Sequence, residues 1–258
     1  MNKLILCEGK DDNCILGYYL FKSSNEPKWM YNKKTKLSAN FQLITNPNGR
    51  EIVEIYVRGN ESKDKTAIWS VGGKDCFEEA IGKAIKICKK FPLERFEDIV
   101  IVTDRDDEEI GAVENRISAI FNKFGWDITL RNHTKNNFEY QVEDRNYSVN
   151  ISPVIIPLDQ NGALETILMN GYANVGDNED KLIVSESIRY IDDLVNSTML
   201  HKHLTKDRMK LKAKFSTMIS VINPDHSTRA LDDILMCFEW EKSPYIQKQF
   251  SIIEDIFK

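Results

Sequence analysis

One pattern that occurs three times along the chain constrains the fold more than any other feature. Each occurrence is an apolar run, a short turn, and then apolar residues at helical spacing; the runs are residues 3–7, 66–71 and 98–103. The third run, DIVIVT, is apolar almost throughout, as expected for a strand covered on both faces. Because successive strand–helix units place their strands parallel, the pattern predicts an α/β fold with a compact, mainly parallel sheet flanked by helices.

Other segments are expected to extend this core. Residues 41–45 and 51–57 flank a turn signal at residues 46–49, which predicts an inserted hairpin within an insertion of about residues 23–64. Residues 126–156 carry short alternating runs, so the sheet is expected to finish there with an antiparallel edge.

The C-terminal part of the sequence has a different character. From about residue 178 it is helical and charged, with Pro224 and Pro244 as breaks. We therefore expect an α/β domain over residues 1–175 and a helical C-terminal appendage over residues 176–258.

Composition limits the location and the partners. Five scattered cysteines without CxxC spacing suggest neither a disulfide framework nor a zinc ribbon, and fit a reducing cytoplasm. No secretion signal or membrane span is expected, because the N-terminal apolar run is too short. Since 35 basic and 40 acidic residues give a net charge of −5, any contact with nucleic acid must be local. The sequence leaves open a homo-oligomer.

Acidic residues follow the first and third apolar runs. Glu8 comes directly after the first run and Asp12 one helical turn later, while Asp104 and Asp106 follow the third run. Because open α/β sheets bind ligands beyond the carboxyl ends of their strands, the four carboxylates are expected to converge there. Converging carboxylates repel one another unless a hard cation such as Mg²⁺ lies between them. Such a site suits phosphoryl chemistry.

A simpler alternative applies to each motif taken alone. Acidic residues at helix N-termini complement the helix dipole, and Asp12 or Asp106 would then only cap a helix. The combination of two motifs, each directly after a buried strand, favours the metal site.

The two motifs also resemble those of a known superfamily. LILCEGKDD is similar to the first Toprim motif, a hydrophobic strand followed by E-G-x-x-D, and VTDRD is similar to the second, D-x-D. The superfamily includes topoisomerase and primase modules, ribosomal-RNA maturation nucleases and the overcoming-lysogenization-defect nucleases of phage defence. The resemblance covers roughly residues 2–168 and implies a Toprim-like catalytic domain with a carboxylate-held Mg²⁺, for which Mn²⁺ can substitute.

The resemblance also implies roles for individual residues. Asp104 and Asp106 would be the principal metal ligands, Asp12 a supporting ligand, and Glu8 a ligand or general acid/base. Glu165 would complete a second metal site, although an ordinary glutamate in the first turn of a helix is an equal alternative.

Several basic residues are candidates for contacts with phosphate. Lys10 and Lys74 lie at predicted strand–helix turns, where exposed main-chain amides attract anions, and Lys10 is also a candidate catalytic residue. The alternative for each is a solvated surface lysine. A predicted amphipathic helix carries a basic side that is either a nucleic-acid surface or a solvated face: Lys206, Arg208, Lys210, Lys212 and Lys214.

From these features we expect a cytoplasmic, Mg²⁺-dependent Toprim-type endonuclease that hydrolyses phosphodiester bonds of DNA or RNA. The resemblance suggests a setting in phage defence with a separate ATPase partner, since the chain has no ATPase motif. The alternative is a non-catalytic Toprim module that binds nucleic acid or such a partner. A phosphatase of other α/β topology ranks low, because it needs a nucleophilic aspartate where this chain has Glu8.

Overall fold

The computed structural model describes residues 2–38, 40–41, 51–59, 64–197, 202–226 and 231–257 of the 258-residue chain. The chain divides into two compact units. Unit 1 contains Met1–Thr103, Glu108–Ile155 and Ser251–Lys258, and unit 2 contains Asp104–Asp107 and Ile156–Phe250. The expected functional domains, 1–175 and 176–258, stay a prediction.

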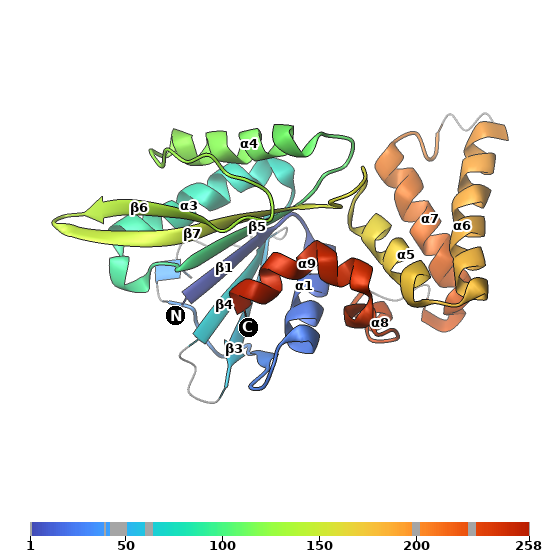
Figure 1. Cartoon of the computed structure of the whole chain (residues 1–258), viewed down its shortest axis with the longest axis horizontal. Helices are drawn as coiled ribbons and strands as arrows, with labels where there is room; N and C mark the ends of the chain where they lie inside the picture. The colour runs from blue at the N-terminus through green and yellow to red at the C-terminus, as the bar shows by residue number, and fades with distance from the viewer. Residues whose placement is uncertain are drawn as a thin grey trace. The chain divides into compact units, whose positions relative to one another are not determined.

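A seven-stranded sheet, counted over the described part of the chain, has the order β2-β3-β4-β1-β5-β7-β6. Its strands are β1 (Asn2–Cys7), β2 (Trp29–Tyr31), β3 (Ile52–Arg58), β4 (Asp64–Ser70), β5 (Asp98–Asp104), β6 (Asn136–Val142) and β7 (Arg145–Ile156). The three apolar runs form β1, β4 and β5, which lie side by side at the centre (Figure 1).

The centre of the sheet is parallel. Ile5 of β1 is in register with Ile68 of β4 and Val100 of β5. Antiparallel pairs join β2 to β3, β3 to β4 and β6 to β7. The prediction of an α/β fold with a mixed, mostly parallel sheet is therefore confirmed, as is the antiparallel edge, which β6 supplies.

Two of the predicted strands are not seen as strands in the described residues. Most of the first strand of the predicted hairpin, residues 42–45, lies outside the described residues; its second strand is β3. The WDITL run, residues 126–130, is not a strand. Trp126 is fully buried there and stacks on Phe138 at 4.9 Å and Tyr140 at 5.2 Å, so tertiary packing overrides the local alternation.

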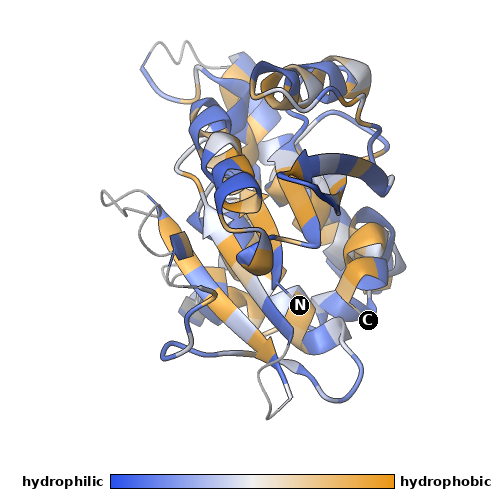
Figure 2. Cartoon of the chain, turned by 90° about the vertical axis from the view of Figure 1, so that its left-hand side faces the viewer, coloured by the Kyte–Doolittle hydropathy of each residue, from blue (hydrophilic) through white to orange (hydrophobic). Residues whose placement is uncertain are grey.

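Helices cover both faces of the sheet in unit 1. On one face lie α3 (Phe77–Lys90) and α4 (Ile110–Lys123), and on the other lie α1 (Lys10–Ser23) and the last part of α9 (Pro244–Phe257) (Figure 1). Hydrophobic residues run along the central strands (Figure 2). Leu4, Leu6 and Ile101 pack with α3 and α4 in one buried cluster, which explains the nearly continuous apolar sequence of these strands.

The end of α9 is tied to unit 1 by hydrogen bonds to its last carbonyl groups. Trp29 Nε1 donates to the Phe257 carbonyl at 2.9 Å, Arg58 Nη1 donates to the same oxygen at 3.2 Å, and Lys3 Nζ donates to the Ile256 carbonyl. These bonds satisfy acceptors that a helix end otherwise leaves unpaired.

Unit 2 is helical apart from its connecting segments. Its helices are α5 (Leu164–Val175), α6 (Asn178–Ser197), α7 (Asp207–Ile222), α8 (Leu231–Leu235) and the first part of α9. Buried Phe215, Met218 and Ile219 mark the inner face of α7. In the described part of the chain, no helix has both the length and the apolar character needed to cross a membrane.

Candidate functional site

The Glu8 carboxylate lies at the carboxyl end of β1, which is one of the central strands of the sheet. Glu8 is only 3% exposed, which is rare for a glutamate. Thr103, near the end of the neighbouring parallel strand β5, donates a hydrogen bond from Oγ1 to Glu8 Oε1 at 2.6 Å. Glu8 is therefore a buried carboxylate held in a defined orientation at the edge where α/β folds bind ligands.

Lys74 is placed beside Glu8 by the turn that follows β4. The main-chain nitrogens of Gly72 and Gly73 donate to the Glu8 carbonyl at 3.0 and 2.9 Å. Both glycines have positive φ, 94° and 129°, a region that glycine adopts without steric cost. The turn leaves Lys74 Nζ 3.9 Å from Glu8 Oε1 and 3.9 Å from Glu108 Oε1. Lys74, predicted as a phosphate contact, thus lies between two carboxylates.

The other residues of the first motif begin α1. The main-chain nitrogen of Gly9 donates to Asp12 Oδ2 at 2.7 Å, so Asp12 caps the helix, as the simpler alternative proposed. Lys10 is the first residue of α1 and is exposed.

Asp104 ends β5 and is 6% exposed. Within unit 2 its Oδ1 accepts a hydrogen bond of 3.0 Å from the main-chain nitrogen of Leu164, the first residue of α5. A carboxylate at a helix N-terminus is stabilised by the helix dipole. Asp104 therefore stabilises the start of α5.

Asp106 has a backbone conformation that is unusual for a residue other than glycine. Its φ is 54°, in the left-handed region that aspartate tolerates better than most residues. Gly162 holds it there through two main-chain hydrogen bonds of 2.7 Å, one in each direction. A side chain at Gly162 would collide with Thr166, so only glycine fits at this position of the loop.

Glu165, the candidate for a second metal site, is paired instead with a cation. Lys212 Nζ lies 2.9 Å from Glu165 Oε1, whose side chain is 12% exposed. Metal binding by Glu165 would have to break this ion pair. The contact removes Lys212 from the freely available basic residues of α7.

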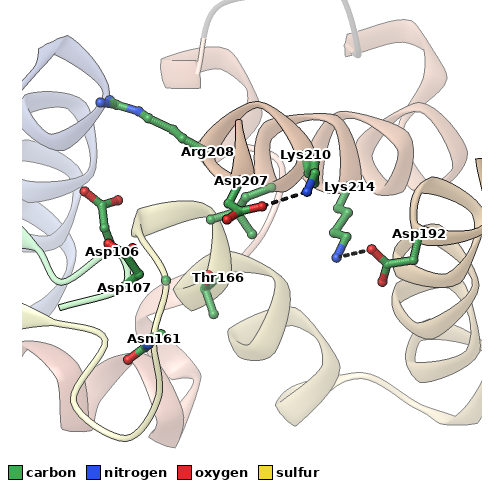
Figure 3. A pocket seen from close by; sticks show the side chains of 11 residues that line it. Asp106, Asp107, Asn161, Thr166, Asp192, Asp207, Arg208, Lys210 and Lys214 are labelled. Carbon is green, nitrogen blue, oxygen red and sulfur yellow. Dashed lines mark hydrogen bonds and ion pairs between the residues drawn. The ribbon is translucent and has the colours of Figure 1, made fainter. Parts of the chain in front are cut away.

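The remaining basic candidates lie on α7 in unit 2. Lys206 is its exposed N-cap residue. Arg208, Lys210 and Lys214 line a pocket together with Asp106 (Figure 3). The structure therefore brings part of the second motif and part of the predicted basic helix to one cavity.

The residues that sequence reasoning missed are polar neighbours of the predicted ones. Thr103 interrupts the apolar sequence of β5 directly before Asp104, and this interruption was a usable signal. Asn161, in the loop before α5, and Thr166, in the first turn of α5, both line the unit 2 pocket. No spacing rule predicts the conformation of that loop.

The two buried cysteines, Cys7 and Cys88, are poorly suited to nucleophilic chemistry. Burial raises the pKa of the Cys7 thiol well above its usual range, with smaller contributions from the nearby Asp12 and Glu8 charges. Burial likewise raises the pKa of Cys88 to about 11. Both thiols therefore stay protonated near neutral pH, whereas the thiolate is the nucleophile.

The carboxylates of the two motifs are hard oxygen donors, the kind that Mg²⁺ prefers. Among the described residues, no three His, Cys, Asp or Glu side chains form a ready-made metal cage. Mg²⁺, however, is usually bound by one or two carboxylates and keeps several waters. Glu8 in unit 1 and Asp104 in unit 2 each supply hard oxygen donors, and each is almost fully buried, where a carboxylate needs positive partners. On donor chemistry, the residues fit Mg²⁺.

Comparison with known proteins places the chain in a family without assigning an activity. Residues 2–248 match the model of a family described as protein of unknown function (DUF3226), and the chain belongs to this family. No curated protein and no solved structure gives a match.

Proposed function

We propose that the protein is a Mg²⁺-dependent, Toprim-like nuclease that hydrolyses phosphodiester bonds of DNA or RNA. The single observation that supports this most is the buried Glu8 carboxylate at the end of β1, oriented by Thr103 and accompanied by Lys74. A buried carboxylate beside a cation at the ligand-binding edge of a parallel sheet is characteristic of functional sites.

The acidic ligands in this proposal are Glu8 and the aspartates that follow Thr103 in the sequence, Asp104 and Asp106. A bound Mg²⁺ supplies positive charge at the phosphodiester and the means to activate water. Mn²⁺ is expected to replace it.

The residues of unit 1 then have separate tasks. Thr103 fixes the Glu8 carboxylate, so that Glu8 holds the metal or accepts a proton from the attacking water. The Gly72–Gly73 turn fixes the backbone beside Lys74. Lys74 attracts a phosphate oxygen and stabilises the negative charge that develops on it.

Purified protein is to be incubated with Mg²⁺ or Mn²⁺ and with plasmid DNA, single-stranded DNA and total RNA. We expect cleavage of at least one substrate that EDTA abolishes and that Glu8→Gln and Asp104→Asn each lower by about 10²-fold or more. Glu139→Gln, an exposed carboxylate on β6, is the matched control and keeps full activity. Cleavage that survives both site substitutions would contradict the proposal.

The second candidate is a non-catalytic module that binds nucleic acid or a separate ATPase partner. The hydrogen bonds of Asp12 to Gly9 and of Asp104 to Leu164 favour it, because both carboxylates already stabilise helix starts. It predicts nucleic-acid binding without cleavage under all the conditions above. A phage-defence setting, a cytoplasmic location and a homo-oligomer remain proposals that follow from the sequence.

A further inference from the structure

The pocket of unit 2 encloses about 610 Å³, a volume within the range of small-ligand sites. The loop residues Asp106, Asp107 and Asn161 contribute to its lining, as do Arg208, Lys210 and Lys214 from the first two turns of α7 (Figure 3). The lining thus joins acidic side chains from the segment after β5 to basic side chains from one helix.

The three basic side chains differ in how strongly the protein already occupies them. Lys214 lies 2.8 Å from Asp192 and its side chain is only 19% exposed, so this pair links α7 to α6. Lys210 lies 2.8 Å from Asp207, whose side chain is 92% exposed; such surface pairs are weak and exchange readily.

Arg208 is different. Within the described part of the chain its guanidinium makes no ion pair or side-chain hydrogen bond, and the residue is exposed. Its side chain extends away from Lys210 and Lys214 (Figure 3). A guanidinium presents several N–H donors in a planar fork that matches two phosphate oxygens. Arg208 is therefore the lining cation most available to an anion.

We infer that this pocket receives a phosphate of the nucleic-acid strand and that Arg208 binds it, while Lys212 and Lys214 stabilise unit 2. The inference rests on the proposed function, because Asp106 and Asp107 repel a bare phosphate unless a divalent cation accompanies it. With that cation, Asp106 would hold the metal, as in the proposed function, and Arg208 would bind the phosphate. Arg208 is thus a positioning residue for the substrate.

The lining also indicates which part of a nucleotide enters. None of the described residues that line the pocket is aromatic, whereas sites that hold unpaired bases commonly stack them on aromatic rings. Asn161 and Thr166 offer hydrogen bonds that suit phosphate or sugar oxygens. Arg208 is therefore expected to act on every sequence alike.

The test measures binding rather than cleavage. Affinity for a short fluorescent single-stranded oligonucleotide is measured over a range of salt concentrations. Ca²⁺ replaces Mg²⁺ in these measurements, and the oligonucleotide is checked afterwards to show that it was not cleaved. Arg208→Ala should weaken binding on the order of fivefold to tenfold and flatten the slope of log affinity against log salt by about 0.7. Arg208→Lys should restore part of the affinity. The matched control is Arg189→Ala on α6 of the same unit, whose side chain is 68% exposed and does not line the pocket; it should bind like the wild type.

Wild-type affinity and slope in Arg208→Ala, or equal losses in Arg208→Ala and Arg189→Ala, would overturn the inference. Glu8→Gln separates this failure from failure of the proposed function. If Glu8→Gln abolishes cleavage while Arg208→Ala binds normally, only the role of Arg208 is wrong. If Glu8→Gln cleaves normally while Arg208→Ala binds weakly, the pocket stands and the proposed active site is wrong.

Discussion

Thr103 Oγ1 donates a 2.6 Å hydrogen bond to Glu8 Oε1 and so joins the ends of two adjacent parallel strands, β5 and β1. Both residues are buried, 3% exposed each. The bond helps to explain how a carboxylate stays buried at the carboxyl end of the central strands, since buried polar groups require hydrogen-bonding partners.

Replacing Thr103 with valine keeps the shape of the side chain but removes this donor. We expect Thr103→Val to lower the free energy of unfolding by about 1–3 kcal/mol, because Glu8 loses a hydrogen bond while it stays buried. Thr103→Ser retains the hydroxyl and should lose less. Urea unfolding of the three proteins measures the difference, and a valine variant as stable as the wild type would show that the bond contributes nothing.

Lys74 should affect metal binding and catalysis in opposite directions. Its ammonium group lies 3.9 Å from Glu8 Oε1, so removing the positive charge should strengthen divalent-cation binding by Glu8. Turnover should fall, because the cation that meets the phosphate is lost. Lys74→Met is compared with Lys89→Met, whose ammonium group donates to the Phe124 carbonyl. Weaker metal binding in Lys74→Met would contradict this account.

Two buried tryptophans allow a matched test of how the end of α9 is held. Trp29 Nε1 donates to the Phe257 carbonyl at 2.9 Å, whereas Trp126 Nε1 is buried without a hydrogen-bond partner among the described residues. Both phenylalanine substitutions remove ring volume, but only Trp29→Phe leaves a helix-end carbonyl short of a donor. We expect Trp29→Phe to destabilise unit 1 by about 1 kcal/mol more than Trp126→Phe does. Equal losses in thermal unfolding would contradict the role of this bond.

Much of the fold follows from local periodicity. The alternation of apolar run and amphipathic helix predicted β1, β4 and β5 with their helices, and the sequence places Glu8 directly after the first run and Asp104 directly after the third. Residues Arg145–Ile156 form the single strand β7, although Ser152-Pro153 within it is a pair that favours a turn.

What periodicity did not predict depends on contacts between distant segments. Lys74 reaches Glu8 only because Gly72 and Gly73 both bond to the Glu8 carbonyl. Likewise, five basic residues looked equivalent on the predicted helix. In the structure Lys212 is paired with Glu165 and Lys214 with Asp192, and these contacts distinguish the two lysines from Arg208.

The central claim is that Glu8 belongs to a divalent-metal site. Its most direct test is titration of the wild type, Glu8→Gln and Glu139→Gln with Mn²⁺, with free Mn²⁺ followed by electron paramagnetic resonance and Mg²⁺ added as competitor. The account predicts that the wild type and Glu139→Gln bind Mn²⁺ alike, that Mg²⁺ displaces it, and that Glu8→Gln binds about tenfold or more weakly. Binding by Glu8→Gln equal to that of the wild type, or none by the wild type, would contradict it.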